Sequence, residues 1–220
     1  VHLMGNTELK GYAGISESSQ LATIYGVYNA KKTLLAGFTT VRDVGAGHFS
    51  GVALKEAINK NVVIGPTMFV SGPALGITGG HCDSNILSHE YDHQSEGVVN
   101  SPWEARKQVR KNRKYGVDLI KFCATGGVLS KNTDVNAKQF TLEEMQAIVD
   151  EAHNHGMKVA AHAHGLEGIR TAIIAGVDSI EHASFIDDAT IELAKERGTR
   201  LAMDVYVSDY ILGEGAKKGI

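Results

Sequence analysis

The stretch "RKYGVDLIKFCATGG" (Arg113–Gly127) contains the pattern that decides the fold of this chain. A helical run ends at Gly116, a residue type suited to a left-handed helix cap, and an apolar strand follows at once. The same order of helix, glycine and strand recurs at Leu34–Val44, His153–Ala163, Ile173–Ala183 and Lys195–Val205. The strands are continuous apolar runs, which indicates that both faces of the sheet are covered. This alternation predicts an α/β fold with parallel strands, either a barrel or a doubly wound sheet.

Seven strands are expected, and their number favours the barrel. They lie near Val1–Leu3, Phe38–Val44, Thr67–Ser71, Leu119–Ala124, Lys158–Ala163, Ser179–Ala183 and Arg200–Val205. No G-x-G-x-x-G motif follows the first of them, and a (β/α)8 barrel usually needs about 250 residues. We therefore predict one incomplete TIM-like (β/α)8 barrel domain over residues 1–220, without its last βα unit. The opening "VHLMGN" has the character of a strand interior, so we expect a segment of a longer protein.

The composition argues against several classes of protein. The chain is 43% hydrophobic and 21% charged with a net charge of −3, which favours neither nucleic acid nor an anionic membrane as a partner. Six basic residues between Arg106 and Lys114 are interpreted as a solvated helix face. No apolar run approaches the roughly 20 residues of a membrane span, and no signal peptide leads the sequence. Cys82 and Cys123 are too few for a disulfide framework, so we expect a reducing cytoplasm, with Cys123 as core packing.

Lys121 lies in the middle of the expected strand Leu119–Ala124, where a charged ammonium is costly to desolvate. Its side chain could simply extend to water at the mouth of the barrel. Alternatively, desolvation lowers the lysine pKa, and the neutral amine can add carbon dioxide to become a carbamate. Such a carboxylate on a long arm could bridge two divalent cations about 3.5–4 Å apart.

Histidines gather at the ends of other strands. His2 belongs to the first strand, His162 and His164 end the fifth, and His182 ends the sixth. A single strand histidine is more often a hydrogen-bonded core residue than a ligand. In a barrel, however, the carboxyl ends of the strands converge on one mouth, so these imidazoles and Lys121 would face one another. Because imidazole is a common ligand of zinc and its neighbours, the pattern predicts a metal site.

These residues lie in a set of motifs that resembles the amidohydrolase superfamily, and within it the zinc-dependent prolidases and arginine-carboxypeptidase-like peptidases. The motifs are "GFTTVRDVG", "SGPALGITGGHCD", "DLIKFCATGG", "KVAAHAHG" and "GVDSIEHASFID". The resemblance covers nearly the whole chain. It implies a binuclear zinc hydrolase of amide or peptide bonds, commonly a homo-oligomer, whose small flanking β-sandwich lies outside this segment.

The resemblance also implies a set of metal ligands. An N6-carboxylated Lys121 bridges the two ions, and His162 and His182 complete one of the two sites. His2 belongs to the other site, as the second histidine of a first-strand His-x-His motif. The family's strand-eight aspartate, a ligand and general base, has no counterpart before Ile220. We therefore expect that these 220 residues alone neither close the barrel nor catalyse.

Two further histidines are candidates for substrate contact. His81 follows two glycines on the unusually long connection Ala74–Asn100, and His164 lies two residues beyond His162. By resemblance, both contact the substrate carbonyl or carboxylate. The implied substrate is a dipeptide or N-acyl amino acid that loses its C-terminal residue, which some relatives prefer as Arg or Lys. Acidic residues that could pair with a guanidinium are Asp83, Asp204 and Asp209.

Alternatives stay open at this point. An imidazolonepropionase-like cyclic amidase or an N-acyl amino acid deacylase would use the same scaffold, although those single-metal relatives generally lack the bridging lysine. A degenerate, non-catalytic barrel could serve as a binding or structural module. Asp43, at the end of the second strand, could orient a ligand or Arg42, although a structural role is expected.

Overall fold

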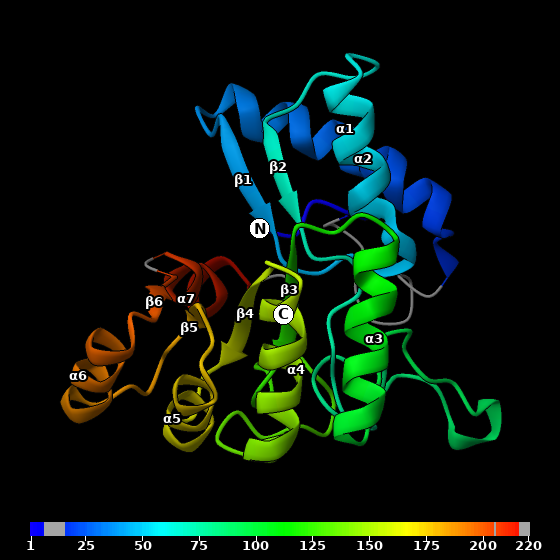
Figure 1. Ribbon diagram of the computed structural model, residues 1–220. Helices are drawn as coiled ribbons and strands as arrows, with labels where there is room; N and C mark the ends of the chain where they lie inside the picture. The colour runs from blue at the N-terminus through cyan, green and yellow to red at the C-terminus, as the bar shows by residue number, and fades with distance from the viewer. Residues whose placement is uncertain (7–15, 205, 216–220) are drawn as a thin grey trace.

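The chain folds into alternating helices and strands, described by a computed structural model for residues 1–6, 16–204 and 206–215 (Figure 1). The α-helices are α1 (Ser19–Leu35), α2 (Ser50–Asn59), α3 (Pro102–Lys114), α4 (Leu142–Asn154), α5 (Leu166–Ala175), α6 (Asp188–Arg197) and α7 (Val207–Tyr210). The strands are β1 (Thr40–Asp43), β2 (Thr67–Val70), β3 (Leu119–Cys123), β4 (Lys158–Ala163), β5 (Ser179–His182) and β6 (Arg200–Ala202). Short helical turns are η2 (Gly47–Phe49), η3 (His89–Tyr91) and η4 (Ile211–Gly215). Within these described ranges, no helix combines the length and the apolarity needed to cross a membrane.

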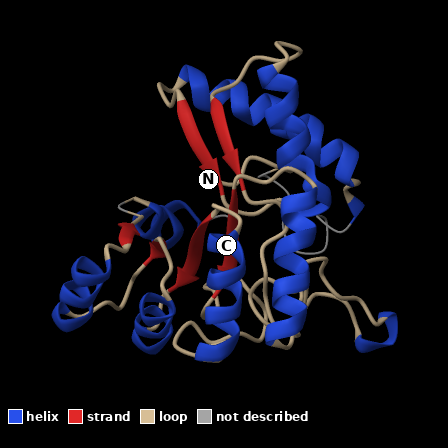
Figure 2. Ribbon diagram, in the orientation of Figure 1, coloured by secondary structure: helices blue, strands red, loops and turns tan. Residues whose placement is uncertain are grey.

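The strand pairs between these elements are parallel and form two sheets (Figure 2). β1 pairs with β2, and β3, β4, β5 and β6 form a four-stranded sheet in chain order, as in the wall of a barrel. The amide of Asp118 donates to the carbonyl of Val70 over 2.8 Å, which connects the end of β2 to the start of β3. The predicted α/β class with parallel strands is confirmed.

The prediction of a strand at Val1–Leu3 is wrong. This segment lies beside the end of β1, where the ammonium of Val1 donates to the carbonyl of Arg42 over 2.8 Å. The amide of Leu3 donates instead to the carboxylate of Asp43, at 3.1 Å. The amide of Val44 also donates to the carbonyl of Val1 over 3.2 Å, so backbone pairing with this strand end is present at Val1, and a side-chain bond replaces it at Leu3. Six of the seven expected strands are present in the part of the chain that the structure describes.

Helix ends follow the capping residues of the sequence. Thr141 and Glu144 form a capping box at the start of α4, in which each side chain accepts from the backbone amide of the other residue. Ser101 caps α3 by accepting a backbone amide three residues later. Gly176 and Gly198 cap α5 and α6 with φ angles of 97° and 72°, a conformation that favours glycine. These caps fix where each helix ends and the next strand begins.

The four-stranded sheet is covered on one face by the helices that follow its strands (Figure 1). All five residues of β3 are buried, so both faces of this strand are covered, as predicted. Phe122 packs edge-on against Phe140, with ring centroids 5.9 Å apart. Because successive strand side chains point to opposite faces, Lys121 and Cys123 face the other way and line a cavity. The strand thus has one apolar face and one chemically reactive face.

The connection between β2 and α3 is long, as predicted, and its base is attached to the sheet. Leu75 lies beside β3, where its amide donates to the carbonyl of Lys121 over 2.8 Å and its carbonyl accepts from the amide of Cys123 over 2.9 Å. Where the loop returns, the amide of Val99 donates to the carbonyl of Gly76 over 2.8 Å. The loop therefore starts and ends next to the carboxyl end of β3.

An ion-pair network joins α3 to α4. The side chain of Glu151 is only 7% exposed, and its two oxygens accept from Arg110 over 2.7 and 3.1 Å. His155 and Arg106 also contact this carboxylate, at 3.1 and 3.5 Å. The hydrogen bonds from Arg110 hold the pKa of Glu151 below its ordinary value. Two basic residues of the predicted solvated face therefore bind a neighbouring helix.

We predict that Glu151→Gln lowers the free energy of unfolding by about 1–2 kcal/mol at pH 7, because it removes a charged acceptor from three donors. The matched control is Asp150→Asn, whose partner Arg106 lies 3.4 Å away and whose side chain is 61% exposed; it should cost less than about 0.5 kcal/mol. Urea denaturation measures both.

The Glu151 contribution should also depend on pH. Its folded-state pKa lies below the ordinary value of 4.5, so the stabilisation is present above about pH 4.5 and is lost as the pH falls through the folded-state pKa. The difference between the wild-type protein and Glu151→Gln should shrink over that range. A difference that grows on acidification would contradict the assigned ion pair.

Candidate metal centre

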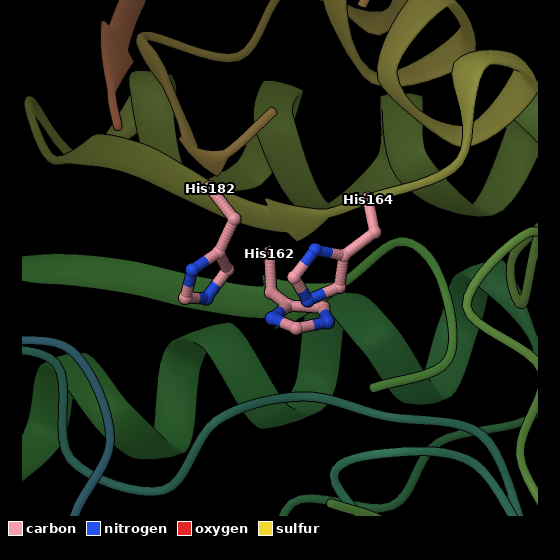
Figure 3. A group of neighbouring side chains, drawn as sticks. All are labelled: His162, His164 and His182. Atoms are coloured by element: carbon pink, nitrogen blue, oxygen red, sulfur yellow. The ribbon is translucent and has the colours of Figure 1, made fainter. Parts of the chain in front are cut away.

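Three histidine side chains converge at the carboxyl ends of β4 and β5 (Figure 3). His162 lies in β4, His164 follows that strand, and His182 ends β5. One ligand nitrogen from each ring lies within 4.8 Å of the others. The parallel register explains this proximity, because Ala163 is level with His182 and the two strand ends coincide. Figure 3 shows the three rings directed toward a shared space.

Burial keeps two of these imidazoles, those of His162 and His164, neutral at pH 7. Burial and, after it, the neighbouring His81 lower the pKa of His162 to about 2. Burial followed by the neighbouring His182 lowers the pKa of His164 to about 4. At pH 7 these two rings are therefore in the neutral form, which is the form that binds a metal. Several neutral imidazoles in one buried space fit zinc or a neighbouring transition metal.

A hydrogen bond orients each ring of the group. Nε2 of His162 donates to the carbonyl of Gly126 over 3.1 Å, which leaves Nδ1 as the free lone pair. Nδ1 of His164 bonds to the hydroxyl of Ser184 at 2.7 Å. Nδ1 of His182 bonds to the carboxylate of Asp204, which leaves Nε2 free. Partners of this kind fix the tautomer and direction of a metal ligand.

Two of these orienting residues correct or extend the sequence interpretation. Asp204 was a candidate for binding a substrate guanidinium, but it bonds to His182 instead. Ser184 had no expected role, and it holds His164. A signal for Ser184 exists in the sequence, because it lies two residues beyond His182 at the same strand end.

Lys121 lies beside this group in a cavity of about 330 Å³. Residues that line the cavity include His2, His81, Cys82, Lys121, His162 and His182. Lys121 is only 4% exposed, so it does not extend into solvent. Burial lowers its pKa to about 8, although the nearby Glu181 acts in the opposite direction. Roughly a tenth of such an amine is neutral at pH 7, and the neutral form is the nucleophilic one.

His2 reaches the same cavity from the start of the chain, although it is not part of the three-histidine group. Its Nδ1 bonds to the carbonyl of Gly45 at 3.0 Å. Asp43 is fully buried and accepts from the amides of Leu3 and Gly45, at 3.1 and 3.3 Å. Asp43 therefore holds both the residue that follows His2 and the glycine whose carbonyl His2 contacts. Orientation of Arg42 by Asp43, considered from the sequence, is wrong, since Arg42 pairs with Glu181 at 2.7 Å.

His81 belongs to the long loop, and its ring centroid lies 4.1 Å from that of His162. Its amide donates to Oε1 of Gln139 over 3.1 Å, and its Nδ1 bonds to the hydroxyl of Ser130. A Cβ added at Gly127 would collide with the His81 ring, so this glycine is what allows the approach. Burial lowers the pKa of His81 to about 4 and keeps it neutral at pH 7. The structure therefore brings four of the five predicted histidines and Lys121 to one cavity, and the ring of the fifth, His164, contacts those of His162 and His182.

The expectation of two unpaired cysteines is wrong, because Cys82 and Cys123 form a disulfide with a Cα–Cα separation of 6.0 Å. The partners lie 41 residues apart, and only the return of the long loop over β3 brings them together. Cys123 is a buried strand residue, as expected, but its sulfur is bonded to the residue next to His81.

We predict that Gly126→Ala lowers the free energy of unfolding by about 1–3 kcal/mol, the usual range for overpacking. Its added Cβ would collide with the backbone carbonyl of Asp134, which has little room to move. Gly47→Ala is the control, because nothing lies within 4 Å of its added Cβ. Equal urea stability of the two variants would argue against the close packing described for Gly126.

The chain is similar to known proteins over nearly its whole length. The sequence profile of the amidohydrolase family matches residues 1–214. Ochratoxinase of Aspergillus niger is 35% identical over 233 residues, which cover 97% of this chain and 47% of that protein. A solved Xaa-Pro dipeptidase with bound methionine in its active site is 38% identical with a TM-score of 0.88, covering 98% of this chain and 54% of that one.

A prolidase complexed with N-methylphosphonate-L-proline is 32% identical, with a TM-score of 0.87 and coverage of 100% of this chain and 55% of that one. The chain thus spans about half the length of these relatives. Their barrels account for the parallel strand order described above. Together with the family match, these relatives confirm the resemblance inferred from the motifs: the chain belongs to the amidohydrolase family.

Proposed function

We propose that the protein is a metal-dependent hydrolase that releases the C-terminal residue from a dipeptide or an N-acyl amino acid. The observation that carries this proposal is the group of three converging imidazoles beside the buried Lys121. Zinc is the metal we expect, because imidazole and carboxylate oxygen are its usual ligands in hydrolases. The relatives support the substrate class, since one solved structure holds methionine and another a proline phosphonate.

Two ions are proposed, with Lys121 between them as an N6-carboxylated bridge. His162 and His182 would hold one ion with this bridge, and their free lone pairs are directed accordingly. His2, which lines the same cavity, would contribute to the other ion. When bound, the ions polarise the scissile carbonyl and make a water molecule nucleophilic near neutral pH.

The chain's own residues then stabilise the charge that develops on the substrate. His81 is neutral at pH 7, and its Nδ1 accepts from Ser130 in the tautomer we propose, so Nε2 carries a hydrogen that it can donate to the oxyanion. His164 is held by Ser184 and would contact the substrate carbonyl or carboxylate. Its place within the three-histidine group also makes it a candidate metal ligand.

A preference for C-terminal Arg or Lys, which the resemblance implied, stays a prediction, and the acidic residues considered as partners of a guanidinium do not support it. The carboxylate of Asp83 accepts from the amides of Gly79, Ser84 and Ser95 within the long loop. Asp204 bonds to His182. Only Asp209 of the three candidates is exposed without such an assigned role among the described contacts. The substrate side chain is therefore left open between apolar, proline and basic residues.

Assembly and location are the remaining predictions. A homo-oligomer is proposed by analogy with such barrels, and light scattering coupled to size-exclusion chromatography measures it. The cytoplasmic location was proposed from the two cysteines, but Cys82 and Cys123 form a disulfide. Structural disulfides are rare in a reducing cytosol, so this observation weakens the original reason for that location.

The central test is Lys121→Arg in the full-length protein. Arginine keeps the positive charge but cannot form the carbamate, so kcat/KM should fall at least about 100-fold and metal content should fall with it. Lys158→Arg is the matched control, because Lys158 is 74% exposed and pairs with Asp178 at the opposite end of β4. Alanyl-proline, N-acetylmethionine and a cyclic amide serve as substrates, with and without chelator.

The possible outcomes distinguish the proposed function from its alternatives. Hydrolysis of the dipeptide or of the acyl amino acid, lost in Lys121→Arg and in chelator but kept in Lys158→Arg, supports the proposal, and the preferred substrate distinguishes a dipeptidase from a deacylase. Hydrolysis of the cyclic amide alone would favour the imidazolonepropionase-like alternative. A wild-type protein that binds no zinc and hydrolyses none of the three substrates would instead support the degenerate, non-catalytic barrel.

A further inference from the structure

We infer that the Cys82–Cys123 disulfide positions His81 for the reaction, so that both cysteines are positioning residues of this site. The inference rests on the proposed contact between His81 and the substrate. Cys82 directly follows His81 in the long loop, and Cys123 lies in β3 two residues beyond Lys121. The bond therefore connects the residue next to His81 to the strand that carries the proposed bridging lysine.

The surroundings of the disulfide are shaped to receive it. Leu75 is hydrogen-bonded along β3, so the loop begins beside Cys123. A Cβ added at the next residue, Gly76, would lie 2.7 Å from Cβ of Cys82, so the glycine makes room for the returning chain. Both cysteines line the same cavity as His81. The disulfide is thus part of the cavity wall, next to the proposed site.

Apart from the ring contact with His162, the other restraints on His81 come from one further segment. Its amide bonds to Gln139 and its Nδ1 to Ser130, while its ring packs over Gly127. These three partners all lie between β3 and α4. They are non-covalent contacts from loop residues, whereas the disulfide is a covalent bond to the strand itself. Without the disulfide, the contacts that hold His81 among the described residues are the ring contact with His162 and the non-covalent contacts to this loop.

A small displacement of such a group affects the rate more than substrate binding. A hydrogen bond made to the developing oxyanion is made in the transition state, so its loss lowers kcat with little change in KM. Misplacement by about 1 Å can cost about 100-fold in rate. The three-histidine group is held by β4, β5 and their own partners, so metal content should not change when the disulfide opens.

The experiment compares the oxidised, zinc-loaded full-length protein with the same protein after treatment with tris(2-carboxyethyl)phosphine. The phosphine gives two electrons to the disulfide and becomes the phosphine oxide with an oxygen from water, and two thiols form. Peptide mapping verifies the bond before treatment and its loss afterwards. We expect kcat to fall about 10- to 100-fold, with KM and zinc content nearly unchanged, and to recover on reoxidation.

Three variants make the test specific. Cys82→Ser/Cys123→Ser should have the low kcat of the reduced protein and should not respond to the phosphine, which excludes an effect of the reagent elsewhere. In His81→Gln, reduction should cause no further loss, because a pair that acts through one residue is non-additive. Gly127→Ala should lower kcat with the disulfide intact, because its Cβ displaces the same ring. An equal fold-loss on reduction in His81→Gln and wild type would overturn the inference.

A second readout does not depend on activity. Diethyl pyrocarbonate modifies accessible neutral imidazoles, and mass spectrometry resolves the rate at each histidine. Reduction should raise the rate at His81 several-fold relative to His153, which lies on α4 and pairs with Asp178. If the wild-type protein hydrolyses none of the substrates while the His81 rate still rises, the proposed function fails and the structural link stands. An unchanged His81 rate would show that the disulfide does not hold this ring.

Discussion

The parallel register of β3, β4 and β5 is the constraint on which the site depends. Cys123 pairs with His162, and Ala163 pairs with His182, so the three strands end at the same edge of the sheet. Side chains two residues apart share a face, and a slip of one residue in the pairing would send each of them to the other face. The caps and glycines that end each helix are therefore part of the site, because they fix where each strand starts.

Desolvation gives these residues their chemistry. Burial lowers the pKa values of Lys121, His162 and His164, so that at pH 7 the two imidazoles are neutral and about a tenth of the lysine is the free amine. A buried group of lone pairs without hydrogen-bond donors is unfavourable, and a bound cation relieves it. A metal ion that bound the folded chain and not the unfolded one would therefore also stabilise the fold. Asp43, Asp204 and Ser184 hold the surrounding histidines in place, which keeps the cavity ready for the ion.

Much of this could be read from the sequence, for identifiable reasons. The recurring helix, glycine and strand units are local signals, so the α/β class and six strands were predictable, and strand-end polar residues then had to converge. Contacts between distant loops left no such signal. The Cys82–Cys123 bond depends on how the long loop returns, and the pairing of Arg42 with Glu181 crosses 139 residues. The error at Val1–Leu3 has the same origin, because a side chain of β1 replaces the expected ladder at Leu3. Gly126 and Gly127 belong to one of the motifs, but the groups that require a glycine there, the carbonyl of Asp134 and the ring of His81, lie in other parts of the chain.

The measurement that tests the central claim most directly is zinc-edge X-ray absorption of the full-length, zinc-loaded protein. The account predicts a first shell of nitrogen and oxygen only, at about 2.0–2.2 Å, with imidazole scattering. It also predicts a second zinc at about 3.5–4 Å, bridged through Lys121. A sulfur shell at about 2.3 Å would contradict it, because it would make the cysteines metal ligands and not disulfide partners. A single zinc without a metal neighbour would remove the bridging role of Lys121.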